Sequence, residues 1–240
     1  MLHEFLTPPD VDRASCELRK LARHPIQHWA LTGGLAIEIH SRIAESAPHI
    51  RRLNDLDFIA DSFESIPSAL GQDFLVVHVH PFAEPGKIML QLADPDAKLR
   101  IDLFRACGST MDRAPRLNLP TGAVRLVSAP DLIARSARLV FDLHQGIPIP
   151  SKHATDFLRL SEMVEPSQVQ GAWRDHRKAT QPDIFDDVEK LLKRLIPASS
   201  TLLIAAEFST DVASVCPSCH PVSTFQLADR SRVLSTLGYC

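Results

Sequence analysis

Hydrophobic residues recur first at helical and then at strand spacing along the front half of the chain. A helical period over residues 10–23, with Asp10 as its cap, predicts a first helix. An apolar run over residues 28–31 leads into a Gly33-Gly34 turn, after which helical spacing continues to about residue 46. Alternating or β-rich runs then predict strands over residues 55–60, 74–80, 87–92 and 99–104.

The second half of the chain is mainly helical in pattern. A loop rich in proline and arginine, residues 113–120, precedes Ser128, a good helix cap. Helices are predicted over residues 128–143, 151–164, 183–195 and 227–237, with a boundary at 197–200 and an apolar run at 202–206. We expect an α+β fold, a mixed sheet flanked by helices and followed by a helical half. The expected domains are residues 1–127, 128–197 and 198–240.

Three aspartates occupy strand positions where their side chains can gather. Alternation puts Asp55 and Asp57 on one face, about 6–7 Å apart at the backbone, because a strand rises ~3.3 Å per residue. Asp102 stands at mid-strand opposite an apolar face, so pairing the two strands would join the three carboxylates. Such charges repel unless a cation lies among them, and magnesium prefers oxygen ligands of this kind. The sequence therefore predicts a magnesium site.

The Gly33-Gly34 turn supplies the other half of a phosphoryl-transfer site. Without β-carbons, these glycines let a phosphate approach the backbone closely, and the helix that follows presents free N–H groups. Thr32 could add a hydroxyl donor. We expect two magnesium ions to bridge a triphosphate and the attacking hydroxyl. Each feature alone is common in structural turns and solvated strands, and their order along the chain is the stronger signal.

That order carries a resemblance. Residues 30–36, 54–58 and 100–103 resemble the polymerase β-like nucleotidyltransferase superfamily, closest to the branch of the abortive-infection type toxins and related small nucleotidyltransferases. The resemblance implies a mixed-sheet catalytic domain, a nucleoside triphosphate donor, two magnesium ions at Asp55, Asp57 and Asp102, and Asp102 as the activator of the acceptor hydroxyl.

A weaker resemblance extends over residues 129–134 and 150–156, where it implies that Lys152 lies near the nucleotide. Lys152 and Asp156 are also spaced as an i,i+4 surface pair, so both interpretations stay open. The chain departs from the family by a long spacing between Gly34 and Asp55 and by Arg135 and Arg138, where relatives often carry lysine.

Composition narrows the class of protein. The 240 residues carry a net charge of -3, so no general basic field for nucleic acid exists, although a local basic face is possible. The start of the chain lacks a signal peptide and no apolar run could span a membrane, so we expect a cytoplasmic protein without membrane partners. Five cysteines suit reduced thiols.

Other candidate ligands have simpler interpretations. Cys216, Cys219 and His220 have the spacing of a zinc knuckle, but structural zinc would need distant ligands such as Cys240 or Cys107. His78 and His80 have a spacing that suits a metal site on a strand, but partly buried or surface histidines are the more common case. Arg51 and Arg52, just before the aspartate strand, could contact a triphosphate or balance the carboxylates, and the balancing role is slightly favoured.

We therefore expect a nucleotidyltransferase that transfers a nucleoside monophosphate to a hydroxyl on tRNA or another RNA, a protein or a small molecule. A toxin of this kind would have a small antitoxin-like partner. The alternative is a catalytically silent member of the same fold that binds nucleotide or a protein partner. A third possibility is a zinc-stapled interaction protein centred on residues 216–240.

Overall fold

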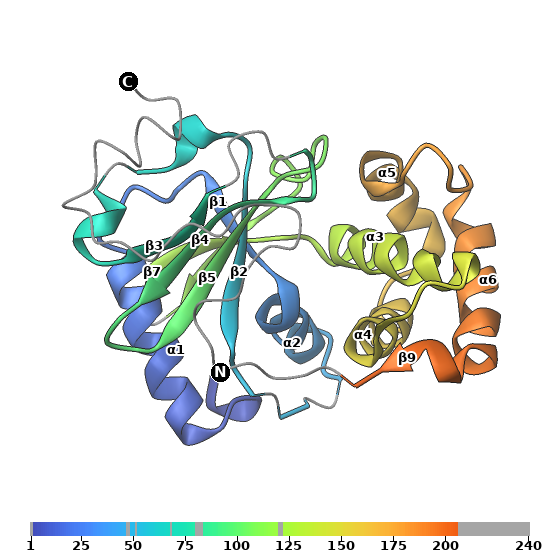
Figure 1. Cartoon of the computed structure of the whole chain (residues 1–240), viewed down its shortest axis with the longest axis horizontal. Coiled ribbons are helices and arrows are strands. Elements are labelled where there is room, and N and C mark those ends of the chain that lie inside the picture. The colour runs from blue at the N-terminus through green and yellow to red at the C-terminus, as the bar shows by residue number, and fades with distance from the viewer. Residues whose placement is uncertain are drawn as a thin grey trace.

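The computed structural model describes residues 2–46, 49–50, 52–67, 69–79, 84–119 and 122–205. These residues form a seven-stranded mixed sheet, with helices against it and a group of helices beside it (Figure 1). The predicted α+β class, with a mixed sheet and a mainly helical second half, is confirmed. The predicted domain boundaries stay predictions.

The sheet has the order β3-β4-β5-β2-β1-β7-β6. Its pairings are parallel for β2 with β5 and for β1 with β7, and antiparallel for the other neighbours. The strands are β1 Trp29–Thr32, β2 Asp55–Ala60, β3 Leu75–Val79, β4 Ile88–Asp94, β5 Leu99–Arg105, β6 Arg116–Leu119 and β7 Gly122–Leu126, and a separate parallel pair joins β8 Ile149–Pro150 to β9 Leu203–Ile204.

Alternation along the two central strands builds the core. Leu56 and Phe58 of β2 are fully buried, as are Leu99, Ile101 and Leu103 of β5. The ring of Phe58 lies 5.7 Å from that of Trp29 on the neighbouring strand. Because successive strand side chains point to opposite faces, this burial leaves Asp55, Asp57 and Asp102 together on the other face of the sheet.

The helices divide into two groups in Figure 1. Helix α1 (Pro8–Leu21) and helix α2 (Gly33–Ile43) contact the sheet, whereas α3 (Ala129–Val140), α4 (Ser151–Ser161), α5 (Pro166–His176) and α6 (Phe185–Ala198) gather beside it. Helix α2 also contacts α3 and α4, so it links the two groups. Short 3-10 helices span Leu2–Glu4, Phe63–Ser65, Leu70–Gln72, Phe141–Gln145 and Ser200–Leu202. None of the described helices combines the length and apolar character that crossing a membrane requires.

Several boundaries differ from the sequence predictions. The predicted loop 113–120 contains β6, because Arg116–Leu119 pairs with β7 in a hairpin. Helix α1 begins at Pro8 after the cap residue Thr7, not at Asp10, since proline suits the first helical turn. Helix α6 continues through Pro197, which is the residue before the last of the helix. A proline at that place disturbs few backbone hydrogen bonds, because almost none of the helix follows it. Helix α5 was not predicted, because its buried Val169 and Trp173 are surrounded by polar residues and Gly171.

Several predictions fall outside the described residues. They concern Arg51, the side chain of His78, all of His80, the zinc candidates Cys216, Cys219, His220 and Cys240, and the helix over residues 227–237. The proposals for structural zinc and for a zinc-stapled protein therefore stay predictions. Of the apolar run 202–206, Leu203–Ile204 forms β9.

Candidate active site

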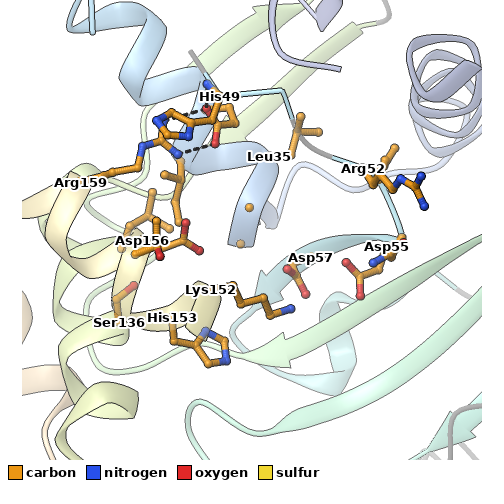
Figure 2. Close-up of a pocket in the computed structure, with 18 of the residues that line it drawn as sticks. Leu35, His49, Arg52, Asp55, Asp57, Ser136, Lys152, His153, Asp156 and Arg159 are labelled. Atoms are coloured by element: carbon orange, nitrogen blue, oxygen red, sulfur yellow. Dashed lines mark hydrogen bonds and ion pairs between the residues drawn. The ribbon is translucent and has the colours of Figure 1, made fainter. Parts of the chain in front are cut away.

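A cavity of about 680 Å³ opens where β2 and the start of α2 face α3 and α4. Its lining includes Gly33, Gly34, Asp55, Asp57 and Lys152, so it gathers most of the residues that the sequence predicted. Figure 2 shows Lys152 extending from α4 toward Asp57, with Asp55 beside it. The volume lies in the range of about 300–1,000 Å³ that is usual for small-molecule sites.

The sheet register brings the three aspartates together. In the parallel pair of β2 and β5, Asp57 stands opposite Asp102 and Asp55 opposite Arg100. Neighbouring strands lie about 4.7–4.9 Å apart, so the backbones of Asp57 and Asp102 are adjacent. Asp102 is buried and lines neither this cavity nor a second cavity described below. It lies on β5 beside Asp57 and is 5% exposed, so it is less accessible than Asp55 and Asp57, which line the cavity.

Arg100 and Gln91 hold two of the three carboxylates. The Arg100 Nη2 atom lies 2.7 Å from Asp55 Oδ2, and Arg100 Nε lies 2.8 Å from Asp102 Oδ1. Gln91 Nε2 donates to the same Asp102 oxygen at 2.9 Å. Within the described residues, no hydrogen-bond donor or ion-pair partner contacts the Asp57 carboxylate. Asp57 is thus the carboxylate of the three that is left open to a ligand.

The electrostatics of the cluster favour an added cation. Burial, followed by the charge of Asp55, raises the pKa of Asp57 to about 7. Burial also raises the pKa of Asp102, although the Arg100 charge opposes that shift. The charges of Arg135 and Lys152 pull the pKa of Asp57 the other way. A buried carboxylate that is costly to ionise gains most from a cation placed beside it.

The glycine turn has a left-handed residue at Gly33, with φ +68°. A β-carbon at Gly33 would lie 1.8 Å from Asp57 Oδ2, so the Asp57 carboxylate occupies the space that any other residue would fill. Gly34 follows as the second residue of α2. Of the two glycines, Gly33 is therefore the one that must be glycine, because of its backbone conformation and its contact with Asp57.

Lys152 is positioned by a buried ion pair between two helices. On α4, Arg159 places Nη1 2.6 Å from Glu38 Oε1 and Nη2 2.9 Å from Glu38 Oε2, and Glu38 on α2 is fully buried. This contact ties the helix of Lys152 to the helix that begins at Gly33. Asp156 is buried, and Lys152 forms no ion pair within the described residues, so the predicted alternative of a Lys152–Asp156 surface pair is wrong.

Thr32 does not join the glycines in the first cavity. Its buried hydroxyl accepts a hydrogen bond from Arg135 Nη1 at 3.1 Å, and it lines the second cavity instead. The guanidinium of Arg135 also lies 4.3 Å from the centre of the Phe104 ring. Arg135 lines both cavities, as do Leu139 and His153, so these three residues lie between them.

The donor set suits a hard divalent cation that also has phosphate ligands. In the described part of the chain, no three His, Cys, Asp or Glu side chains are grouped as a complete metal cage. Magnesium usually binds through one or two carboxylates together with waters and substrate phosphates. Asp55 and Asp57, which face the cavity from one strand, fit that kind of site, and Asp57 has its oxygens free.

Sequence reasoning missed the partners of the predicted residues. Arg100 stands two residues before Asp102, so strand alternation could have placed it on the carboxylate face. Gln91 depends on the register of β4 with β5, and the Glu38–Arg159 pair joins residues 121 positions apart. No local pattern in the sequence signals those two contacts.

No protein-family model matches the chain, and no curated protein matches it. Three solved structures are similar at low identity. The antibiotic-resistance factor ANT(2'')-Ia has 14% identity and a TM-score of 0.44, over 69% of this chain and 90% of that one. An antigenic nucleotidyltransferase-like protein from Paracoccidioides brasiliensis has 18% identity and a TM-score of 0.45, over 81% and 95%. The Megavirus polyadenylate synthase has 12% identity and a TM-score of 0.36, over 81% and 42%.

Proposed function

We propose that this chain is a nucleotidyltransferase that transfers a nucleoside monophosphate from a nucleoside triphosphate to a hydroxyl group. The observation that carries the proposal is the unpaired Asp57 carboxylate, which lies against the Gly33 turn, beside Asp102 and within a cavity that Lys152 enters. Phosphoryl transfer requires a metal-binding carboxylate, a turn that binds phosphate and a positively charged side chain at one place.

The donor would bind by its phosphates at the start of α2. Free N–H groups in the first turn of a helix, and the positive end of its dipole, favour phosphate there. Lys152 supplies a positive charge from the opposite wall, and Arg52 lines the same cavity from the segment before β2. The cavity volume of about 680 Å³ leaves room for the nucleoside as well.

Asp55 and Asp57 would hold magnesium, with Asp102 completing the set for a second ion. When bound, magnesium neutralises charge on the phosphates and makes the acceptor hydroxyl easier to deprotonate. In the transfer, the acceptor oxygen forms a bond to the α-phosphorus, the bond to pyrophosphate breaks, and the hydroxyl proton passes to Asp102. The sheet register that places Asp102 beside Asp57 supports this role, because a general base must lie close to the group it deprotonates.

One observation favours a second candidate function, a catalytically silent nucleotide-binding protein. The Arg100 guanidinium bridges Asp55 and Asp102, where it already neutralises much of the charge that would attract magnesium. Such a protein would bind triphosphate without transfer. The toxin role, the small antitoxin-like partner, and RNA, protein or small molecule as acceptor stay predictions from the resemblance.

Two aspartate variants test the proposal. Asp57→Asn should abolish the dependence of triphosphate binding on magnesium, because it removes the open carboxylate. Asp102→Asn should slow single-turnover transfer by about 10²-fold or more while triphosphate affinity changes far less, since a general base acts mainly in the transition state. Affinity is measured by calorimetry with each triphosphate, and transfer by labelling of cell extract.

Asp61→Asn is the matched control, because Asp61 is exposed just beyond the end of β2. It should leave binding and transfer unchanged. Equal triphosphate affinity with and without magnesium would contradict the metal site. Magnesium-dependent binding with no transfer to any component of the extract would instead support the silent protein.

A further inference from the structure

A second cavity of about 320 Å³ adjoins the first along the same face of the sheet. Its floor includes Ile59 and Phe104, which stand two residues beyond Asp57 on β2 and two beyond Asp102 on β5. Residues two apart on a strand share a face and lie about 6–7 Å from each other. The second cavity therefore begins two residues along the strands from the carboxylates, and Arg135, Leu139 and His153 line both cavities.

Positive charge dominates the second cavity. Its lining contains five Lys and Arg side chains, Lys87, Arg105, Arg135, Arg138 and Lys178, against the two carboxylates Asp131 and Asp142. The first cavity, in contrast, is lined by four of each sign. A surplus of cations in a concave site raises the local concentration of anions.

The two carboxylates of the second cavity are already paired. Asp142 Oδ1 lies 2.8 Å from Lys178 Nζ, and buried Asp131 accepts two hydrogen bonds from Arg113, at 2.9 and 2.7 Å. His176 Nε2 also lies 3.2 Å from Asp131 Oδ1. Neither carboxylate is therefore free to neutralise the remaining cations of the cavity.

Two arginines of α3 lack a carboxylate partner within the described residues. Arg135 contacts the Thr32 hydroxyl and the Phe104 ring. Arg138 Nη1 lies 3.5 Å from the Pro85 carbonyl oxygen and 3.9 Å from Cys107 Sγ. Guanidinium groups present a fork of donors that matches phosphate oxygens. Both side chains thus have unused capacity for an oxyanion.

We propose that the second cavity binds a phosphate ester carried by the acceptor, so that the substrate which receives the nucleotide is itself an anion. This inference rests on the proposed function. The phosphate would lie between Arg135 and Arg138, and a hydroxyl elsewhere on the same molecule would extend past Arg135 to the carboxylates. A sugar phosphate and the phosphorylated end of an oligonucleotide both carry a phosphate ester and a hydroxyl of this kind. The cavity is less than half the volume of the first, which suits a single phosphate group.

Cys107 provides a reporter inside this cavity. Its thiol is buried among the lining residues. Burial raises the pKa of that thiol, but the hydrogen bond with His176 and the nearby positive charges outweigh burial, so the pKa lies below its usual value. Alkylating reagents react with the thiolate, so Cys107 is modified only when the reagent enters the cavity that the thiol lines. The rate at which iodoacetamide modifies Cys107, measured by mass spectrometry of its peptide, should fall when an anion fills the cavity.

Inorganic phosphate is the first probe, with neither nucleotide nor magnesium present. We expect phosphate to slow alkylation of Cys107, and Arg138→Gln to weaken the phosphate affinity by about tenfold or more, the effect of one charged hydrogen bond. Each variant is compared with itself with and without phosphate, because Arg138 also influences the thiol. Arg52→Gln, which changes a cation of the first cavity, should leave the protection intact.

Other outcomes overturn the inference. Phosphate that gives no protection, or protection that survives in Arg138→Gln, would remove the site. Loss of magnesium-dependent triphosphate binding in Arg138→Gln would assign the cavity to the donor phosphates, again against the inference. Wild-type protein that binds phosphate but no triphosphate would instead contradict the proposed function, and with it the acceptor role.

The source of the phosphate is tested by competition. Ribose 5-phosphate is compared with ribose. A short RNA that carries a 5'-phosphate is compared with the same RNA that lacks this terminal phosphate. Protection by the phosphorylated member of either pair supports the inference and identifies the source. Equal behaviour of both members in both pairs contradicts it, because the phosphate would then contribute nothing to recognition.

Discussion

The two cavities meet at Arg135 but differ in the charged groups that have no oppositely charged partner among the described residues. The first contains a carboxylate, Asp57, without a partner among the described residues and has a balanced set of charges. The second contains two arginines without a carboxylate partner in that same part of the chain and a surplus of positive charge. Under the two proposals, the first cavity would bind phosphates together with a cation, whereas the second would bind a phosphate directly through its arginines.

Each cavity also has a buried ion pair, whose two charges neutralise each other and are not available to a ligand. Glu38 with Arg159 supports the first, and Asp131 with Arg113 supports the second. Both carboxylates are fully buried and both accept two hydrogen bonds from one arginine. In these two pairs the carboxylate is fully buried and paired with arginine, whereas Asp57, Arg135 and Arg138 have no oppositely charged partner among the described residues.

The largest expected effect comes from breaking the structural pair of the first cavity. Arg159→Met removes both guanidinium hydrogen bonds of the buried Glu38 carboxylate and should destabilise the protein by about 3–5 kcal/mol, the usual cost of removing one partner of a buried ion pair. Thermal and denaturant unfolding measure this effect. Triphosphate binding should weaken because α4 carries Lys152, while phosphate protection of Cys107 should persist in the folded protein.

Arg194→Met on the exposed face of α6 is the matched control and should change stability by less than about 0.5 kcal/mol. The double variant Glu38→Met Arg159→Met should recover most of the lost stability, since it removes both charges. An Arg159→Met protein as stable as the wild type would show that Glu38 does not depend on this pair.

The sequence predicted features that follow from local alternation. The strand over residues 55–60 is β2 to the residue, and the burial of Leu56 and Phe58 follows from the same alternation that aligns Asp55 with Asp57. The meeting of Asp57 with Asp102 was predicted on the condition that their two strands pair, and β2 and β5 do pair in parallel. The alternation of hydrophobic residues along the strands thus predicted which face of the sheet bears the carboxylates.

Long-range contacts could not be predicted in this way. The second cavity combines Gly86 and Lys87 before β4, Arg138 on α3 and His176 at the end of α5, which no local pattern connects. The bridging role of Arg100 requires the parallel register of β2 with β5. The orientation of Thr32 toward Arg135 depends on where α3 packs. Tertiary placement, rather than residue type, decided each of these features.

A smaller effect tests whether a raised carboxyl pKa is itself a sign of function. Burial, with the Asp94 charge second, raises the pKa of Glu17 to about 8, although Glu17 lines neither cavity. Both of its side-chain oxygens lack a hydrogen-bond partner among the described residues. The folded protein thus keeps a proton that the unfolded chain releases above about pH 4.5, so stability should fall as pH rises from about 4.5 to 8.

Glu17→Gln removes this ionisation and should flatten that decline, with a gain of roughly 2–4 kcal/mol above pH 8. Unfolding curves across pH measure the effect, and Glu84→Gln at an exposed position serves as the control. Triphosphate and phosphate binding should not change. Altered binding in Glu17→Gln would weaken the distinction between cavity charges and buried structural ones.

The last prediction separates the backbone strain at Gly33 from its contact with Asp57. Gly33 and Gly146 both have left-handed φ values, +68° and +71°, but a β-carbon at Gly146 would meet nothing within 4 Å. Gly146→Ala should therefore cost only the strain of about 1–2 kcal/mol that a left-handed residue carries. Gly171→Ala within α5, also without a neighbour, should stabilise the protein by roughly 0.5–1 kcal/mol.

Gly33→Ala should cost at least as much stability as Gly146→Ala and, unlike it, should weaken magnesium-dependent triphosphate binding by about tenfold or more, which corresponds to ~1.4 kcal/mol. The reason is the 1.8 Å approach of the added β-carbon to Asp57 Oδ2, which forces the Asp57 carboxylate away from the Gly33-Gly34 turn. Phosphate protection of Cys107 in the second cavity should be unaffected. If Gly33→Ala and Gly146→Ala lose stability equally and both bind triphosphate normally, Gly33 serves only the turn, and the coupling of Asp57 to the phosphate site is wrong.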